Sequence, residues 1–258
     1  MAINQKSSSS TVKIWAHRGA NEYAPENTME AFDMAVRLGA DGVELDVHQT
    51  RDQEIVVIHD EKLDRTSTGR GFVKDYSLQE LRKFDYAKGT RFEGKGHYTI
   101  PTLRDVFELL KPTGLTINIE LKTNIFPYLG IERKILQMAE EYGMRERVWY
   151  SSFNRFSIEK IHLMDPGVKV GFLYGEIFSG MPVLARNLGL TALHPSFSNL
   201  ISPHFMEDCR ENGIAVNMWT IDTPEQMRIC FRAGVHAVIT NYPDRARKIL
   251  EEMRENSR

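Results

Sequence analysis

A short apolar run followed by a longer amphipathic stretch recurs eight times along the chain, from Thr11 onward. This alternation is typical of parallel α/β folds, and eight units are the number that closes a TIM (β/α)8 barrel. The expected strands are Val12 to Ala16, Gly42 to Val47, Leu115 to Leu121, Val148 to Ser151, Val168 to Leu173, Thr191 to Leu193, Ile214 to Met218 and Val235 to Ile239. We therefore expect a flexible tail over residues 1–11 and a single α/β barrel domain over residues 12–258.

Several of the expected helices carry a recognisable start. Asn, Ser and Thr cap the first turn of a helix, and proline is tolerated at its first position. The start signals are Asn27-Thr28, Thr102, Ser202-Pro203 and Thr223-Pro224. They place helices after the first, second, sixth and seventh strands, as a barrel requires.

Composition and charge limit the class of partner. The 33 basic and 35 acidic residues give a formal charge of 33 − 35 = −2, so no basic field attracts nucleic acid. The N-terminus lacks the apolar core of a signal peptide, and no segment holds the roughly 18 apolar residues of a spanning helix. We expect a cytoplasmic protein without a transmembrane segment.

Its two cysteines, Cys209 and Cys230, are expected to be free thiols. The sequence leaves the oligomeric state open.

The connection between His59 and Thr102 is much longer than the others. It is polar and contains one short helix-like segment near Ser77 to Phe84. A connection of this length after a barrel strand usually covers the mouth of the barrel and bears on function. Residues 60–98 are therefore expected to form a small insertion, or cap, after the second strand that shapes substrate selectivity.

Carboxylates share one face of the second expected strand. Side chains alternate between the two faces of a strand, so Glu44 and Asp46 point the same way, and Glu120 on the third strand joins them. Buried carboxylates need compensation, and an all-oxygen set without a thiolate suits a hard cation. We expect these three residues to bind one divalent cation, Ca2+ or Mg2+. The alternative is that each forms an ordinary ion pair, for which Lys122 is a candidate.

Two histidines and two cations follow strands at the same end of the expected barrel. His17 and His59 are placed for proton transfer, because imidazole titrates near neutral pH. Arg18 and Lys122 offer positive charge to an anionic oxygen. Two further histidines, His48 and His194, are expected to line the pocket. Together these groups describe a site for a small phosphate ester.

At these residues the chain resembles the glycerophosphodiester phosphodiesterase family, from Val12 to about Ile249. The motifs that carry the resemblance, in the family's order, are His17-Arg18-Gly19, Pro25-Glu26-Asn27-Thr28, Glu44-Leu45-Asp46-Val47, His59-Asp60, Leu63-Asp64-Arg65-Thr66, Pro101-Thr102-Leu103, Asn118-Ile119-Glu120-Leu121-Lys122, Ser152-Phe153, Trp219-Thr220 and Thr240-Asn241-Tyr242-Pro243-Asp244.

The resemblance implies a TIM barrel that hydrolyses glycerophosphodiesters to glycerol 3-phosphate and an alcohol. It implies that His17 and His59 are the general acid and base, in an order that the sequence does not give. The same likeness implies an attack on phosphorus by the substrate's own 2-hydroxyl. The implied ligands are Glu44, Asp46 and Glu120 for the metal, Arg18 and Lys122 for the phosphate, and Trp219 for the pocket wall.

Three other functions remain open on the sequence. A phosphodiester lyase of the same barrel would stop at a cyclic phosphate. A lysophospholipase D-like enzyme would differ in the alcohol or acyl group of its substrate. A non-catalytic barrel that binds phosphorylated ligands would lack a histidine or carboxylate, and none of the expected groups is missing.

Overall fold

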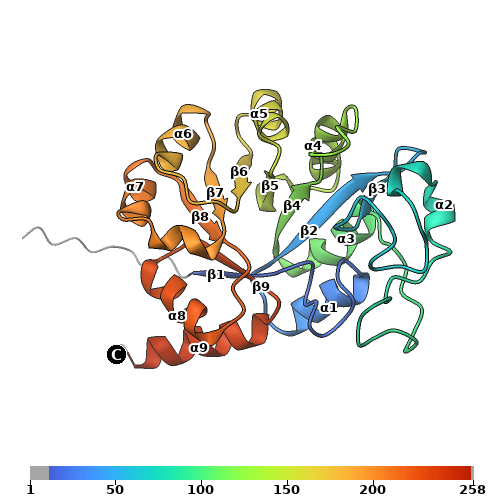
Figure 1. Ribbon diagram of the computed structural model, residues 1–258, viewed down its shortest axis with the longest axis horizontal. Coiled ribbons are helices and arrows are strands. Elements are labelled where there is room, and N and C mark those ends of the chain that lie inside the picture. The colour runs from blue at the N-terminus through green and yellow to red at the C-terminus, as the bar shows by residue number, and fades with distance from the viewer. Residues whose placement is uncertain (1–11, 257–258) are drawn as a thin grey trace, which may run out of the picture.

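The strands of the computed structural model, which describes residues 12–256, form one closed parallel barrel (Figure 1). The strands are β1 (Lys13–Ala16), β2 (Gly42–Gln49), β3 (Ile55–Val57), β4 (Thr116–Leu121), β5 (Val148–Ser152), β6 (Lys169–Tyr174), β7 (Ala192–Pro195), β8 (Ala215–Met218) and β9 (Ala237–Thr240). Pairing runs β1-β9-β8-β7-β6-β5-β4-β2, and β1 also pairs with β2, which closes the ring. The expected TIM barrel is confirmed. The tail over residues 1–11 lies outside the described residues.

Helices surround this ring. The α-helices are α1 (Met29–Arg37), α2 (Leu78–Leu81), α3 (Leu103–Leu110), α4 (Ile131–Glu141), α5 (Arg155–Met164), α6 (Met181–Asn187), α7 (Phe205–Glu211), α8 (Pro224–Ala233) and α9 (Pro243–Glu255). The 3-10 turns are η1 (Val73–Asp75), η2 (Lys111–Thr113), η3 (Arg145–Arg147) and η4 (Phe197–Ile201). In residues 12–256 no helix is both long and apolar enough to cross a membrane.

Three of the predicted helix starts are confirmed and one is displaced. Thr28, Thr102 and Thr223 are the N-caps of α1, α3 and α8. Ser202 instead follows the 3-10 turn η4, and α7 begins at Phe205 after His204 in the left-handed region. The Ser-Pro pair therefore marks the exit from a turn, and the chain needs one more reversal before the helix begins.

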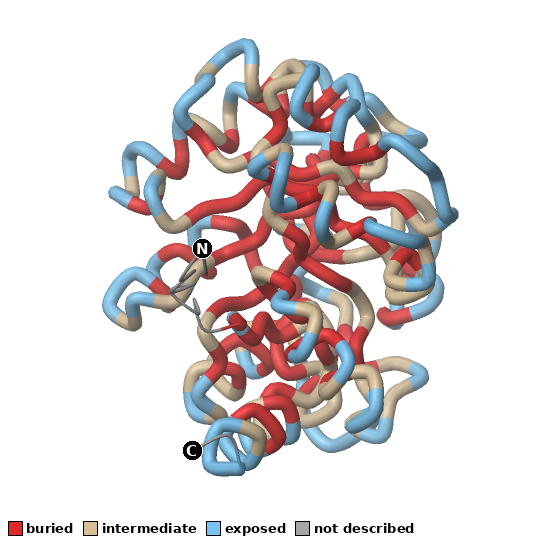
Figure 2. Tube along the Cα trace, turned by 90° about the vertical axis from the view of Figure 1, so that its left-hand side faces the viewer, coloured by how far each residue is buried: buried red, intermediate tan, exposed pale blue. Residues whose placement is uncertain are grey.

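The inner face of the barrel is filled by aromatic rings below the carboxyl ends of the strands. Trp15 on β1 and Trp149 on β5 pack with ring centroids 5.7 Å apart, and the ring of His194 lies 6.3 Å from Trp15. Gly171 on β6 gives this histidine its room, because a Cβ there would lie 2.4 Å from the imidazole. Figure 2 shows the resulting continuous buried interior. These layers form a floor beneath the site.

An outer core lies between the strands and the helices. Phe32 of α1 and Phe107 of α3 are fully buried there, and truncating either to alanine would cost about 3–5 kcal/mol. Cys209 on α7 and Cys230 on α8 are buried free thiols, as expected.

The long connection after β2 begins with a hairpin and continues as the insertion. β3 runs antiparallel to β2, with Val47 opposite Val57. The insertion and the segments that flank it share a separate apolar core, formed by Val56, Ile58, Leu63, Val73, Leu81, Tyr86 and Ile100. A capping box between Ser77 and Glu80 starts its short helix α2. In Figure 1 this region stands at one side of the barrel, beside β3 and α3.

Candidate active site

A cavity of about 150 Å³ opens at the carboxyl ends of the barrel strands. Its lining combines polar groups on or just after β1, β2, β3 and β4 with mainly apolar groups on or just after β5, β6, β8 and β9. The lining residues are His17, Arg18, Glu44, His59, Asn118, Glu120, Phe153, Leu173, Trp219, Thr220 and Ile239. The cavity thus has one charged wall and one apolar wall, and Trp219 and Phe153 form part of the second with their rings 5.6 Å apart.

Three carboxylates meet on the charged wall. The register of β2 on β4 sets Asp46 beside Glu120, and Glu44 lies two residues earlier on the same face. One oxygen from each of the three lies within 4.8 Å of the others, and the residues are at most 8 % exposed. Asn27, at a φ of 57°, donates its side-chain amide to Asp46 over 2.9 Å. The strands and the loop after β1 therefore hold the cluster in place.

Arg18 and Lys122 only partly balance these acids. Arg18 has a φ of 54° and donates its backbone N–H to Glu44 over 2.9 Å, while its Nη1 donates to Glu26 over 3.0 Å. Lys122 Nζ lies 2.7 Å from Glu120 and 3.7 Å from Asp46. Left-handed backbone is unusual for arginine, and such conformations cluster at functional sites.

The pKa values in this cluster follow from burial and from these charges. Burial, reinforced by the neighbouring Asp46 and Glu120 carboxylates, raises the pKa of Glu44 well above its usual value. Burial would raise the pKa of Asp46 too, but the charges of Lys122 and nearby cations lower it below its ordinary value. The cluster therefore contains carboxylates that differ strongly in how readily they ionise.

His17 is held by an amide from the end of β9. Its Nδ1 lies 2.7 Å from Oδ1 of Asn241, whose own amide nitrogen donates to Asp222 over 2.7 Å. Burial, followed by the charge of Arg18, lowers the pKa of His17 from 6.5 to about 4. The imidazole is therefore neutral near pH 7.

His59 is held by a carboxylate. Its Nδ1 lies 2.6 Å from Asp60, and its Nε2 lies 3.2 Å from Lys122 Nζ. A carboxylate only accepts hydrogen bonds, so Nδ1 carries a hydrogen, and Nε2 is the nitrogen left for proton transfer on the side of Lys122.

An arginine from the insertion connects these groups. Arg65 donates to both oxygens of Asp60, over 2.7 and 2.9 Å, and to both oxygens of Glu26, over 2.7 and 3.0 Å. Glu26 in turn accepts from Arg18. Arg65 belongs to one of the sequence motifs, but nothing in its spacing from Glu26 and Asp60 predicts that it reaches both acids.

Six of the predicted site residues line this cavity, with Trp219 on its apolar wall. Asp46 and Lys122 contact that lining, and two predicted pocket residues do not reach it. His194 is fully buried in the floor, where its Nε2 lies 2.9 Å from the Asn217 side-chain amide. His48 is also fully buried and bonds to the Tyr128 hydroxyl over 2.8 Å. Neither is among the residues that line the cavity. Asp222 was missed altogether, since its contact with Asn241 exists only once the barrel has closed.

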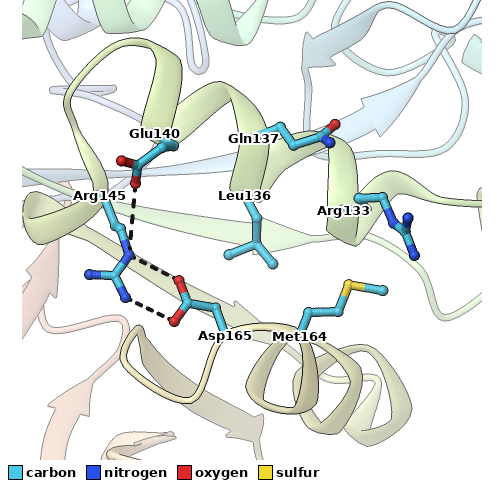
Figure 3. A pocket seen from close by; sticks show the side chains of 7 residues that line it. All are labelled: Arg133, Leu136, Gln137, Glu140, Arg145, Met164 and Asp165. Carbon is cyan, nitrogen blue, oxygen red and sulfur yellow. Dashed lines mark hydrogen bonds and ion pairs between the residues drawn. The ribbon is translucent and has the colours of Figure 1, made fainter.

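A second, more open hollow of about 440 Å³ lies outside the barrel, between α4 and α5 (Figure 3). Three of its charged groups pair with one another: Arg145 pairs with Asp165 over 2.8 Å and approaches Glu140 at 3.9 Å. None of the reactive residues singled out from the sequence lines it. The hollow at the strand ends is therefore the candidate active site.

The residues present fit a divalent cation. Oδ1 of Asp46 is buried and has no hydrogen-bond partner, an arrangement that is costly for a carboxylate oxygen. Among the linked groups of the site, the acids Glu26, Glu44, Asp46, Asp60 and Glu120 face the cations Arg18, Arg65 and Lys122, an excess of 5 − 3 = 2 formal negative charges when all the acids are ionised. An oxygen-rich set with this excess suits a hard dication.

Comparison with known proteins agrees with this site. The family model described as "Glycerophosphoryl diester phosphodiesterase family" matches residues 17–245. A protein of Caldanaerobacter subterraneus subsp. tengcongensis named glycerophosphodiester phosphodiesterase is 43% identical, over 90% of this chain and 94% of the relative. One of Bacillus altitudinis with the same name is 36% identical, over 94% of this chain and 99% of the relative.

A solved structure of a phosphodiesterase has the same fold as this chain. An Oleispira antarctica phosphodiesterase, solved in complex with the product sn-glycerol-3-phosphate, superposes with a TM-score of 0.86 at 26% identity. The match covers 93% of this chain and 97% of that one. Sequence, fold and cavity therefore agree, and the chain belongs to the glycerophosphoryl diester phosphodiesterase family.

Proposed function

We propose that this enzyme hydrolyses glycerophosphodiesters to glycerol 3-phosphate and an alcohol, using a divalent cation and the two histidines. The observation that carries the proposal is the convergence of His17, His59 and three buried carboxylates on one small cavity. The relatives' names and the product bound to the Oleispira antarctica enzyme support this substrate class.

Glu44, Asp46 and Glu120 would hold the cation. A bound Ca2+ or Mg2+ would polarise the phosphoryl group and stabilise the negative charge that builds on its oxygens. Lys122 has three N–H donors and gives one to Glu120, so N–H groups remain that a phosphoryl oxygen can accept from when His59 is the acid. Arg18, on the same wall, adds a second fixed positive charge.

The proton transfers fall to the histidines. In the first step the substrate's 2-hydroxyl bonds to phosphorus and the bond to the leaving alcohol breaks, which gives a cyclic phosphate. Because its lowered pKa leaves His17 unprotonated near pH 7, Nε2 of this residue is available to accept the hydroxyl proton, and His59 as the acid supplies a proton to the leaving oxygen. In the second step water opens the ring and the two histidines exchange roles.

The test is turnover of a panel of glycerophosphodiesters by metal-stripped enzyme, before and after Mg2+ or Ca2+ is added. We expect glycerol 3-phosphate, identified by phosphorus NMR, only when a cation is present. Unchanged turnover after exhaustive chelation would remove the metal from the proposal. Accumulation of the cyclic phosphate as the final product would show a lyase instead of a hydrolase.

A further inference from the structure

A chain of hydrogen bonds continues behind His17, on the side away from the cavity. Oδ1 of Asn241 lies 2.7 Å from His17 Nδ1 and accepts from the side-chain amide of Asn21 over 2.7 Å. The Asn241 Nδ2 donates to Oδ2 of Asp222 over 2.7 Å. Oδ1 of Asp222 accepts from the Asn241 backbone over 2.9 Å and from the Thr240 hydroxyl over 3.1 Å.

The chemistry of these groups leaves one arrangement of the Asn241 amide. An ionised carboxylate has only acceptor atoms, so Asp222 requires the NH2 end of the amide. The oxygen end then faces His17, where Asn21 also donates to it. A carbonyl oxygen cannot donate, so Nδ1 of His17 must carry the hydrogen.

The position of this hydrogen determines what His17 offers to a substrate in the cavity that it lines. In a neutral imidazole with its hydrogen on Nδ1, the second nitrogen, Nε2, has a free lone pair. This nitrogen is the one that can accept a proton from a substrate hydroxyl. The opposite tautomer would present an N–H to that hydroxyl and could not act as a base.

We propose that Asp222 is a positioning residue: acting through the amide of Asn241, it holds His17 in the Nδ1–H tautomer. The inference rests on the proposed function for its catalytic meaning, because it assigns His17 a proton-accepting role. Asp222 lies in the connection after β8, 19 residues before Asn241, and touches no group of the cavity lining directly in the hydrogen bonds of residues 12–256.

Asp222→Asn tests the proposal at nearly constant volume. Its new NH2 group competes with that of Asn241, so the Asn241 amide turns over and donates to His17 Nδ1. The imidazole then takes the Nε2–H form. Because the Nε2–H tautomer cannot act as the base, we expect kcat to fall by about tenfold or more. The upper limit is the loss of about 10⁴-fold known when a catalytic imidazole takes the wrong tautomer.

A reciprocal exchange separates positioning from a merely structural role. In Asp222→Asn with Asn241→Asp, the amide at 222 donates to the carboxylate at 241, which again accepts from His17 Nδ1 and Asn21. The double variant should regain most of the lost kcat. Asp244→Asn is the matched control, because Asp244 accepts from Tyr23 near the same end of the barrel and lies outside this chain.

The decisive readout is carbon and nitrogen NMR of isotope-labelled histidine in the full chain, which distinguishes the two tautomers. We expect the Nδ1–H signature in the parent, the double variant and Asp244→Asn, and the Nε2–H signature in Asp222→Asn. An unchanged tautomer in Asp222→Asn would overturn the proposal, as would a loss of kcat that the reciprocal exchange does not restore. The NMR result stands even if glycerophosphodiesters prove not to be substrates, so the two proposals fail separately.

Discussion

The surroundings of the two site histidines differ in kind. His17 bonds to a neutral amide at the end of a barrel strand, within a network of short hydrogen bonds. His59 bonds to a carboxylate that is itself paired with Arg65, a residue of the insertion whose side chain is 47% exposed. One imidazole is therefore oriented by the barrel framework and the other by ion pairs that join the insertion to the barrel.

This difference bears on what the insertion does. The sequence led us to expect an insertion that shapes selectivity, because the reactive groups it indicated lie on the barrel. Arg65 indicates a different role. It bonds to Asp60, the partner of His59, and to Glu26, the partner of Arg18. The insertion should therefore affect the chemistry through the His59 side of the site much more than through the His17 side.

The largest effect is expected from a change in the carboxylate cluster, which the His17 side and the His59 side of the site share. Glu44→Gln deletes one charge of the carboxylate cluster at nearly constant volume, so the fold should persist while the cation is lost. Calorimetric titration with Mg2+ or Ca2+ should show weakened binding, and turnover should fall below detection at cation concentrations that saturate the parent. If this variant bound the cation as tightly as the parent does, the cluster would not be the metal site.

Replacing either histidine is the next largest change. General acid–base catalysis contributes about 10²- to 10⁴-fold, so His17→Ala and His59→Ala should each lower kcat by that order. Steady-state kinetics measures the loss of kcat, and thermal unfolding of the same variants shows whether they still fold. A loss below tenfold for one of them would show that the two histidines are not partners.

Arg65→Met sharpens the comparison between the two sides. Removing the guanidinium frees Asp60 and Glu26, and a lost outer partner of a functional group typically costs about 10- to 100-fold, so kcat should fall by roughly that amount. Arg91→Met is the matched control, because Arg91 also joins the insertion to the barrel, through Glu22 at 3.1 Å, but lies away from the histidines. Equal losses in both variants would indicate a general loosening of the insertion.

The smallest expected effect is on stability and depends on pH. The pKa of His17 is lowered from 6.5 to about 4, so between these values the unfolded chain binds the proton and the folded chain does not. The free energy of unfolding should therefore fall as pH drops from about 7 to about 5, by roughly 1–2 kcal/mol from this residue. Urea unfolding of His17→Gln should show a smaller drop than the parent. An identical drop would mean that burial does not keep His17 neutral.

The barrel and the acidic cluster were predictable because both depend on local periodicity. Alternation along β2 already places Glu44 and Asp46 on one face, and parallel pairing with β4 adds Glu120. Periodicity gives the face of a side chain but not its depth along the barrel axis, which depends on the stagger of the strands. His194 was expected to line the pocket, yet its ring packs 6.3 Å from that of Trp15, which places it in the floor below the cavity.

Contacts that depend on chain closure were not predictable. Asp222 meets Asn241 only because β8 and β9 lie side by side, and Arg65 meets Glu26 across 39 residues. Neither pair has a spacing that a helix or a strand would dictate. The residues that orient the histidines are thus the part of the site that required the structure.

The most direct test of the account uses a 2-deoxy analogue of a glycerophosphodiester substrate, followed by phosphorus NMR. The analogue keeps its phosphate and therefore its contacts with the cation, Arg18 and Lys122, but it has no hydroxyl from which a histidine can take a proton. The account predicts competitive inhibition with no detectable turnover. Hydrolysis of the analogue at a rate close to that of the parent substrate would show direct attack by water and would contradict it.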